Sequence, residues 1–329
     1  MRVSFIIPLY NCLPLTQAML ASLQATLPPG LTHEIIFVDD GSTDGTRDWL
    51  KTLTAPPFRV LLNERNLGYA VGNNRAATVA RGEFLVLLNS DLVLTPGWLE
   101  PMFAAHEALR TRAGLIGNVQ VQATSGVIDH TGIIINRTGK PEHDRRPPSH
   151  LRLLLRPLRQ VPAVTGACLL VERALWQQLG GFDESYVNGG EDIDLGFRAR
   201  AVGRVNAVAL RSIIRHHVSA SPGRKLRDEE NSARLVRRWQ REFVAAAEHA
   251  TRDWCREYLE GAFVTPLSSE YRLAINSCLH AAHLRPTPPM EAVHSLEAGQ
   301  AREFARWQEM FGATSRSEPL PGPPTAAAG

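Results

Sequence analysis

Apolar runs that alternate with amphipathic segments constrain the fold of this chain more than any other feature of its sequence. Four runs, VSFIIP, EIIFV, RVLL and FLVLL, lie at Val3–Pro8, Glu34–Val38, Arg59–Leu62 and Phe84–Leu88. After the first run, apolar residues recur every three or four positions over Leu15–Leu27, which predicts a helix. Strands that alternate with helices predict βαβ units and a mostly parallel sheet. We therefore expect an α/β fold.

The rest of the chain continues with shorter elements. We expect strands at Leu115–Val121, Val127–Ile135, Val164–Glu172, Val205–Ala209 and Ser212–Arg215, and helices at Gly97–Leu109 and Ala174–Leu179. The segment from Asn136 to His150 is rich in Gly, Pro, Arg and His, which predicts a mobile, lid-like loop. Helical patterns at 227–259, 271–283 and 290–311 predict a helical C-terminal segment, and the Pro, Ala and Gly tail from Ser315 predicts disorder.

Composition narrows the class of protein. The 329 residues are 44% hydrophobic and 21% charged, which is typical of globular chains, and a net charge of +3 is too small to indicate nucleic-acid binding. The four cysteines form no C-x-x-C pair, and the amino terminus shows no signal-peptide pattern, so we expect a cytoplasmic protein with reduced thiols. No apolar stretch approaches the roughly 20 residues that span a bilayer, so any membrane contact is expected to be peripheral.

Acidic residues cluster where strands or loops are expected to end. They are Asp39 with Asp40, Asp91 after FLVLLNS, and Glu191 with Asp192. The carboxyl ends of parallel strands share one sheet edge, where open α/β sheets bind ligands. Carboxylates gathered there repel one another unless a cation is present, and Mg²⁺ is typically held by one or two carboxylates plus substrate phosphates. For Asp91 alone, a turn residue is an equally good interpretation.

Seven sequence motifs, in the order in which they occur along the chain, resemble those of a known protein family. They are IIPLYN, VDDGSTDGT, NLGYAVGNN, LLNSDLVL, GACLLVER, GGFDESYVNGGEDIDLGFRARAVG and RHHVSAS. Together they resemble an inverting family 2 glycosyltransferase of the Rossmann-like glycosyltransferase A fold, and most closely the rhamnosyltransferase-like bacterial branch that builds surface polysaccharides. The resemblance covers about Arg2 to Ser221. It implies a nucleotide-diphosphate sugar donor, a carbohydrate or lipid-linked acceptor, and Mg²⁺ or Mn²⁺ as cofactor.

The resemblance also assigns the donor side of the site. Asp39 matches the aspartate that contacts the nucleobase, with Pro8 and Tyr10 at the same end. Gly68 and Asn74 fall in the motif that approaches the nucleotide, and the absence of a G-x-G-x-x-G after the first strand argues against a nicotinamide dehydrogenase.

The metal assignment follows from the D-x-D motif of the family. Asp91 matches its last aspartate, the ligand that meets the metal and diphosphate. Its first position is Asn89 here, which can bind a ribose or a metal-bound water but adds no charge. His216 is the better match for a further metal contact and His217 is the alternative, since neighbouring side chains on a strand point to opposite faces.

The acceptor side is assigned around the acidic stretch. Asp192 matches the general base that takes the proton of the acceptor hydroxyl in a metal-assisted single displacement, with Gly166 and Glu191 beside the acceptor. Glu191 also has a structural interpretation, because Asn188-x-x-Glu191 resembles a capping box.

The domain plan combines both kinds of inference. We expect residues 1–222 to form the catalytic domain, with a nucleotide-binding half at about 1–110 and an acceptor half at about 111–222. We expect a helical segment at residues 223–313 and a disordered tail at 314–329. Arg234 to Arg241 form a basic helix face with two alternative interpretations. The face is either exposed to solvent or in contact with an anionic membrane at the inner face of the cell membrane. A sugar-nucleotide nucleotidyltransferase and a non-catalytic nucleotide-sugar binding module are the alternative functions.

Overall fold

A computed structural model describes residues 2–136, 140–148, 150–155, 157–217, 228–239, 242–243, 275–276, 279, 284–285 and 290–311. These residues form two compact units, which we describe separately. The first unit holds the described residues up to 133 and those between 143 and 231. The second holds the described residues between 134 and 142 and those from 232 onward.

The first part of the chain forms the alternating strands and helices that its sequence predicts. The elements are β1 (Val3–Leu9), α1 (Leu13–Thr26), β2 (His33–Asp39), α2 (Thr46–Lys51), β3 (Phe58–Leu62), α3 (Tyr69–Val79) and β4 (Phe84–Leu88). Each expected strand is confirmed to within one residue at either end. The prediction succeeds because every residue of β1 and β4 is buried, as unbroken apolar runs in a parallel sheet require.

The later elements are shorter and more varied. They are β5 (Leu92–Val93), α4 (Glu100–Leu109), a 3-10 turn (Arg110–Arg112), β6 (Ala113–Gln122), β7 (Ile128–His130), β8 (Ile133–Ile135), β9 (Pro141–His143), α5 (His150–Leu155), β10 (Leu158–Gln160), β11 (Cys168–Glu172), α6 (Arg173–Leu179), α7 (Glu191–Ala201), β12 (Val205–His216), α8 (Asp228–Arg238) and α11 (Met290–Phe311).

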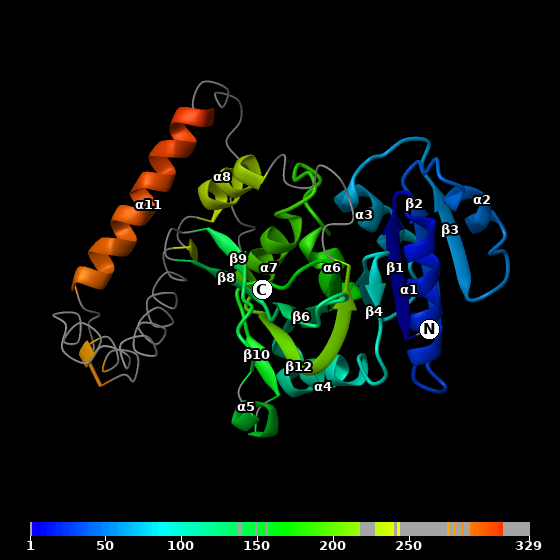
Figure 1. The fold of residues 1–329 in the computed structure, drawn as a ribbon, viewed down its shortest axis with the longest axis horizontal. Coiled ribbons are helices and arrows are strands. Elements are labelled where there is room, and N and C mark those ends of the chain that lie inside the picture. The colour runs from blue at the N-terminus through cyan, green and yellow to red at the C-terminus, as the bar shows by residue number, and fades with distance from the viewer. Residues whose placement is uncertain are drawn as a thin grey trace. The chain divides into compact units, whose positions relative to one another are not determined.

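One large sheet organises the first unit. Its strand order is β10-β12-β6-β11-β4-β1-β2-β3, with β5 beside β12 and β7 beside β6 (Figure 1). Strands β3, β2, β1 and β4 run parallel, and β12 is parallel to β6. Strand β11 is antiparallel to both β4 and β6, so β6 and β12 point in the same direction as β4. The expected α/β fold with a mostly parallel sheet is confirmed.

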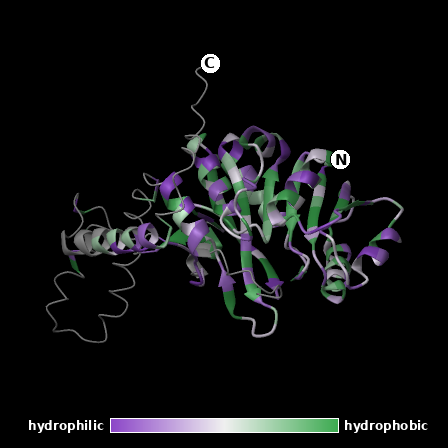
Figure 2. Ribbon diagram, turned by 90° about the horizontal axis from the view of Figure 1, so that it is seen from above, coloured by the Kyte–Doolittle hydropathy of each residue, from purple (hydrophilic) through white to green (hydrophobic). Residues whose placement is uncertain are grey.

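Helices cover both faces of this sheet. Side chains from α1 and α4 join one buried apolar cluster with β1 and β4, and side chains from α3, α6 and α7 join a second cluster on the opposite face. Figure 2 shows the strands as predominantly hydrophobic, whereas the helices carry hydrophilic residues as well. This three-layer arrangement follows from the apolar stripe that each helix presents to the sheet.

Three strand predictions were wrong in detail. The expected strand Val127–Ile135 is divided into β7 and β8 by Gly132, whose φ of +129° favours glycine. The two short strands expected between Val205 and Arg215 form the single strand β12, which keeps its pairing with β6 through an irregularity between Ala209 and Ile213. The strand expected from Val164 begins only at Cys168.

The segment expected to be a mobile, lid-like loop contains regular structure in its described part. Strand β9 pairs with β8. The buried carboxylate of Asp144 accepts hydrogen bonds from Arg146 and from Arg159, each at 2.9 Å. Burial alone would raise the pKa of Asp144, but these bonds and charges lower it below its ordinary value. The expectation of a loop without regular structure is therefore wrong for Pro141–His143, which form β9.

The second unit contains helix α11. Lys140 forms an ion pair of 3.1 Å with Glu303 and lies 5.7 Å from the ring centre of Trp307. Most of the helices expected at 227–259 and 271–283, and the tail expected to be disordered, lie outside the described residues. Among the residues that the structure describes, no helix is long and apolar enough to cross a membrane.

Candidate active site

The sheet topology brings the expected site residues of the first unit to one edge. The carboxyl ends of β2, β4 and β12 lie at this edge because these strands point in the same direction. Asp39 ends β2, Asp91 follows β4 and His216 ends β12. Strand β11 runs the opposite way, so its amino end, just after Gly166, lies at the same edge. Residues that are up to 177 positions apart in the sequence are thus assembled by strand order alone.

The two aspartates after β2 have different partners. The Asp40 carboxylate accepts three hydrogen bonds of 2.8 Å, from Nδ2 of Asn63 and from the backbone amides of Leu67 and Gly68. Asp40 thereby fixes the loop that leads into α3. The buried Asp39 accepts a bond from the Ser42 amide at 3.2 Å and lies 3.3 Å from Nε of Arg47.

The loop after β1 lies beside this aspartate pair. The Asn11 amide donates to Oγ of Ser42 at 2.8 Å, and Oδ1 of Asn11 accepts from the Thr43 amide at 2.8 Å. Tyr10, just before, is 48% exposed. Gly45, rather than Ser42 or Thr43, is the N-cap of α2, and the side chain of Ser42 bonds to the loop after β1.

The remaining predicted donor residues are held by the scaffold. Pro8 lies where a Cβ on Gly72 would approach within 3.4 Å, so the start of α3 is closely packed on β1. The Gly68 amide is bound by Asp40, and Asn74 uses its carboxamide to bind the Phe182 backbone and Glu184. Asn74 therefore positions a loop 108 residues away. Its contact with the nucleotide stays a prediction.

Asp91 and His216 face each other at the edge of the sheet. Oδ1 of Asp91 lies 3.3 Å from Nε2 of His216, yet both atoms are buried and neither has hydrogen-bond geometry to any partner in the described structure. His217 contacts Asp91 only through its backbone amide, which donates to the Asp91 carbonyl at 3.1 Å. Of the two histidines, His216 is the one whose side chain reaches Asp91.

These two atoms have the chemistry of a partial cation site. A carboxylate oxygen and a neutral imidazole nitrogen are ligands for divalent metals such as Mn²⁺ and Zn²⁺. Buried polar atoms without partners are costly unless a ligand satisfies them. Among the described residues no cluster of three or more His, Cys, Asp or Glu could hold a metal ion. The pair therefore fits a cation that takes its other ligands from substrate phosphates and water.

A third histidine lies near this pair. His130, on β7, is fully buried, its Nδ1 lies 3.2 Å from Nδ1 of His143, and its Nε2 has no partner in the described structure. Burial, followed by the charges of His143 and His216, lowers the pKa of His130 well below its ordinary value, so the ring is neutral near pH 7. Sequence inspection gave no signal for His130.

Asp192 lies at the first turn of α7 and is tied to the segment before β11. Its Oδ2 accepts a 2.8 Å hydrogen bond from the Gly166 amide, and its Oδ1 accepts one of 2.8 Å from the Ile193 amide. The Gly166 carbonyl in turn accepts a 2.7 Å bond from Oη of Tyr69. A Cβ on Gly166 would lie 3.1 Å from that hydroxyl, so only glycine fits between Tyr69 and Asp192 without a shift.

Tyr69 is the residue of this network that sequence inspection missed. It stands at the start of α3, directly after the loop that Asp40 holds, and packs against Phe182 at a centroid distance of 5.9 Å. The available signal was an aromatic residue within the NLGYAVGNN motif. Glu191 bonds back to the Gly189 amide at 2.9 Å, so it does stabilise the helix start, although Gly190 rather than Asn188 is the N-cap.

Comparison with known proteins places this geometry in context. The family model described as Glycosyl transferase family 2 matches residues 4–180. The O-antigen biosynthesis protein RfbC of Myxococcus xanthus is 32% identical over 233 residues, which are 67% of this chain and 18% of that protein. The N-acetylglucosaminyl-diphospho-decaprenol L-rhamnosyltransferase of Mycobacterium tuberculosis (strain ATCC 25618 / H37Rv) is 27% identical over 87% of this chain and 96% of that protein.

Solved structures show the same fold. GalNAc-T7 with UDP, GalNAc and Mn²⁺ superposes with a TM-score of 0.60 over 74% of this chain and 50% of that one, at 18% identity. The glycosyltransferase A fold expected from the sequence is thereby confirmed. The chain spans only 27% and 18% of the length of two of the curated relatives that it matches.

Proposed function

The chain belongs to glycosyl transferase family 2, and we propose that it moves a sugar from a nucleotide-diphosphate sugar to an acceptor hydroxyl, with inversion at the anomeric carbon. The observation that carries this proposal is the convergence of Asp39, Asp91 with His216, and Asp192 at one sheet edge. A carboxylate placed like Asp192 suits a general base for an acceptor hydroxyl, which a non-catalytic binding module does not require. Family membership also favours transfer over both alternatives.

The donor nucleotide is assigned to the loops after β1, β2 and β3. Asp39 is buried; its Oδ2 forms an ion pair of 3.3 Å with Nε of Arg47 but has no hydrogen-bond partner in the described structure. We assign it to the nucleobase, with Pro8 and Tyr10 alongside. Asp40 keeps the Gly68 loop in place, so the backbone can approach the nucleotide without reorganisation.

Asp192 is assigned as the general base. Each carboxylate oxygen has two acceptor sites, and each takes one backbone amide, so one site per oxygen remains for an acceptor hydroxyl. The hydroxyl oxygen bonds to the anomeric carbon while the bond from that carbon to the diphosphate breaks, and the hydroxyl proton passes to Asp192. The bonds from Gly166 and Ile193 hold the carboxylate in a fixed direction for this transfer.

Asp91 and His216 are assigned to the donor diphosphate. A divalent cation bound there, Mg²⁺ or Mn²⁺, would supply positive charge that stabilises the departing diphosphate. Asn89 follows β4 with a partly exposed side chain and would bind the ribose or a metal-bound water. The names of the two relatives, an O-antigen biosynthesis protein and an N-acetylglucosaminyl-diphospho-decaprenol L-rhamnosyltransferase, favour a carbohydrate or a lipid-linked sugar as acceptor. We further assign the reaction to cell-surface glycan synthesis at the cytoplasmic face of the membrane.

A panel of nucleotide sugars tests the proposed function. Purified protein is incubated with each donor and Mn²⁺, and release of the nucleoside diphosphate is measured without acceptor. We expect slow hydrolysis of one or a few donors, because water can replace the acceptor hydroxyl in an inverting site. Release of inorganic pyrophosphate, with a nucleoside triphosphate and a sugar phosphate as substrates, would indicate the nucleotidyltransferase instead. Donor binding without any turnover would indicate the binding module.

A further inference from the structure

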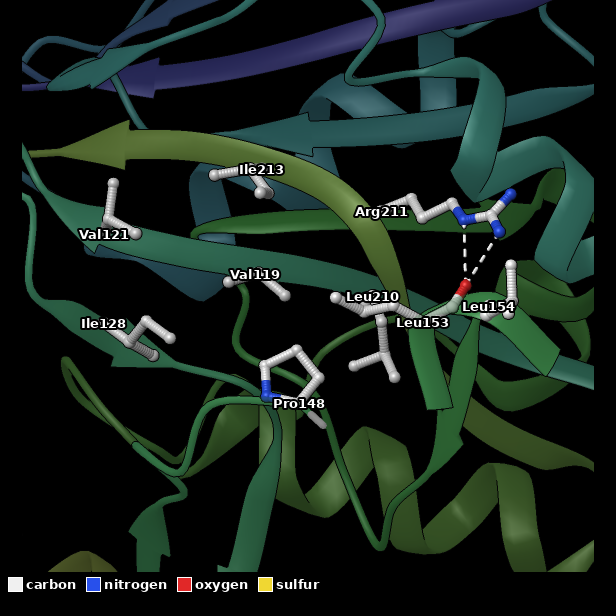
Figure 3. Close-up of a pocket in the computed structure, with 9 residues that line it drawn as sticks. All are labelled: Val119, Val121, Ile128, Pro148, Leu153, Leu154, Leu210, Arg211 and Ile213. Carbon is white, nitrogen blue, oxygen red and sulfur yellow. Dashed lines mark hydrogen bonds between the residues drawn. The ribbon is translucent and has the colours of Figure 1, made fainter. Parts of the chain in front are cut away.

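An apolar groove of about 630 Å³ lies on the sheet of the first unit. It is lined by residues of β6, β7, β12 and α5 together with Pro148, and Figure 3 shows the nine residues: Val119, Val121, Ile128, Pro148, Leu153, Leu154, Leu210, Arg211 and Ile213. Eight of these nine are apolar. A groove of this kind on a protein surface commonly marks a binding site.

Exposed leucine and isoleucine side chains surround the groove. Leu154 is 71% exposed, Leu155 is 67% exposed and Ile213 is 45% exposed. Arg211 holds the leucine-bearing helix against the sheet, since its Nε and Nη2 donate to the Leu153 carbonyl at 3.1 and 2.7 Å (Figure 3). The leucines are thus presented by a fixed support. Protruding side chains favour an extended apolar partner over a small enclosed ligand.

The charge beside the groove is positive once the ion pairs of its carboxylates are taken into account. Arg211, Ile213 and Arg215 alternate with buried residues along β12, so both arginines lie on the exposed face of that strand. The carboxylates in the lining segments are neutralised: Asp129 pairs with Arg145 at 3.6 Å, and Asp144 is bound by two arginines. Within the described part of the chain neither Arg211 nor Arg215 forms an ion pair, and an apolar surface beside such arginines complements an anionic lipid, in which phosphate groups lie above hydrocarbon.

We propose that this groove, with Leu154, Leu155 and Ile213, docks the first unit onto an anionic lipid bilayer. Leucine and isoleucine enter the boundary between headgroups and acyl chains, and Arg211 and Arg215 contact lipid phosphates. This assigns membrane contact to α5 and β12 rather than to the basic helix around Arg234. The docking proposal rests on the proposed function in one respect: access to a lipid-linked acceptor is the reason for docking.

The position of the groove fits that reason. Val119 and Leu210 belong to the same buried cluster as Leu195 of α7, so the groove lies on the sheet face that α7 covers. Asp192 lies at the start of α7. A bilayer at the groove would therefore adjoin the face of the sheet that carries the proposed general base, near the carboxyl ends of β6 and β12.

Vesicle flotation tests the proposal without any donor or acceptor. The full chain is mixed with vesicles of phosphatidylcholine alone or with phosphatidylglycerol added. We expect binding only with phosphatidylglycerol, and a loss of at least about tenfold in the bound fraction for the double variant Leu154→Glu, Leu155→Glu. The matched control is Leu284→Glu, because Leu284 is 73% exposed in the second unit. Arg215→Gln should reduce the preference for phosphatidylglycerol.

Each other outcome overturns the proposal. Failure of the wild type to bind, or equal binding by the double variant, removes the groove as a docking surface. So does an equal loss in Leu284→Glu. If the wild type is a dimer that the double variant converts to a monomer, and vesicle binding is unchanged, the groove binds a second copy instead. Circular dichroism and donor hydrolysis show that the variants are folded, and donor hydrolysis separately tests the enzyme.

Discussion

Asp40 and Asp91 follow strands of the same sheet at the same edge, yet their surroundings are opposite. The Asp40 carboxylate accepts three hydrogen bonds, all from the loops that it fixes. The Asp91 side chain has one close contact in the described structure, His216 at 3.3 Å, and that contact lacks hydrogen-bond geometry. One carboxylate is satisfied by the fold, whereas the other is left with unused acceptor capacity.

The difference distinguishes structural from functional carboxylates. Because a buried polar atom without a partner costs about 1–3 kcal/mol, a fold keeps one mainly where a ligand compensates for it. Asp192 is intermediate, since two backbone amides orient it while acceptor sites remain on both oxygens. Substitution should therefore affect turnover at Asp192 and Asp91 and stability at Asp40.

Asp192→Asn should have the largest effect. The amide is nearly the same shape but cannot take the acceptor proton, so transfer should fall by about 10²- to 10⁴-fold. Donor affinity and thermal stability should stay close to wild type, because Asn can still accept the Gly166 or Ile193 amide. Initial-rate kinetics and calorimetric titration with the donor measure the two effects. Wild-type turnover in this variant would exclude Asp192 as the base.

The pair of histidines offers the next test. His216→Gln should raise the Mn²⁺ concentration needed for half-maximal donor hydrolysis by about 10- to 100-fold, because its side chain faces Asp91. His217→Gln is the matched control, since His217 reaches Asp91 only through its backbone amide. Metal titrations of both variants provide the comparison. Equal shifts in the two would show that the effect is not specific to the Asp91 side chain.

Some of these features could be read from sequence and others could not. The strands β1 to β4 were predictable because burial on both faces requires unbroken apolar runs. The alternation of strand side chains predicted that at most one histidine of the pair reaches the metal, and His216 is the one whose side chain reaches Asp91. The family motif favoured His216, but the approach of its side chain to Asp91 depends on the register of β12 against β5, which pairs His216 with Leu92. That register depends on the irregularity in β12, which the sequence presented as a break between two strands.

The Tyr69, Gly166 and Asp192 network was beyond sequence inspection for a related reason. Its bonds join residues 97 and 26 positions apart. They form because β11 enters the sheet antiparallel between β4 and β6, and an apolar run such as CLLVE does not reveal which strands it will pair with. Local propensity determines that β11 is a strand, whereas packing of the whole unit determines its neighbours.

Asp40→Ala should chiefly reduce stability. It leaves the Leu67 and Gly68 amides and the Asn63 side chain without their acceptor, at a cost of about 1–3 kcal/mol in the free energy of unfolding. Urea denaturation measures this loss. Asp40→Asn, which retains one carbonyl oxygen, should recover part of it. A large fall in turnover with unchanged stability would place Asp40 among the functional carboxylates and remove the contrast with Asp91.

Glu34 is a further carboxylate satisfied by the fold, and it extends the comparison to acid pH. Its substitution should have the smallest effect of the four. This buried carboxylate accepts bonds from Oγ of Ser4 and the Arg81 amide, each at 2.6 Å, and from Arg59 at 3.0 Å. Burial would raise the pKa of Glu34, but these bonds lower it below its ordinary value of 4.5. A lowered pKa in the folded state means that its contribution to stability is complete above about pH 4.5 and is lost as the pH falls further.

Glu34→Gln should therefore be less stable than wild type at pH 7 and should lose less stability between pH 5 and pH 3. Urea denaturation of wild type and variant at several pH values measures the free energy of unfolding of each and its slope with pH. The matched control is Asp48→Asn: the exposed carboxylate of Asp48 pairs with the exposed Lys51, solvent screens this pair, and the substitution should change the slope much less. A steeper acid slope in Glu34→Gln than in wild type would mean that Glu34 is not stabilised as an anion by the fold, and that satisfied carboxylates such as Asp40 cannot be recognised from their hydrogen bonds alone.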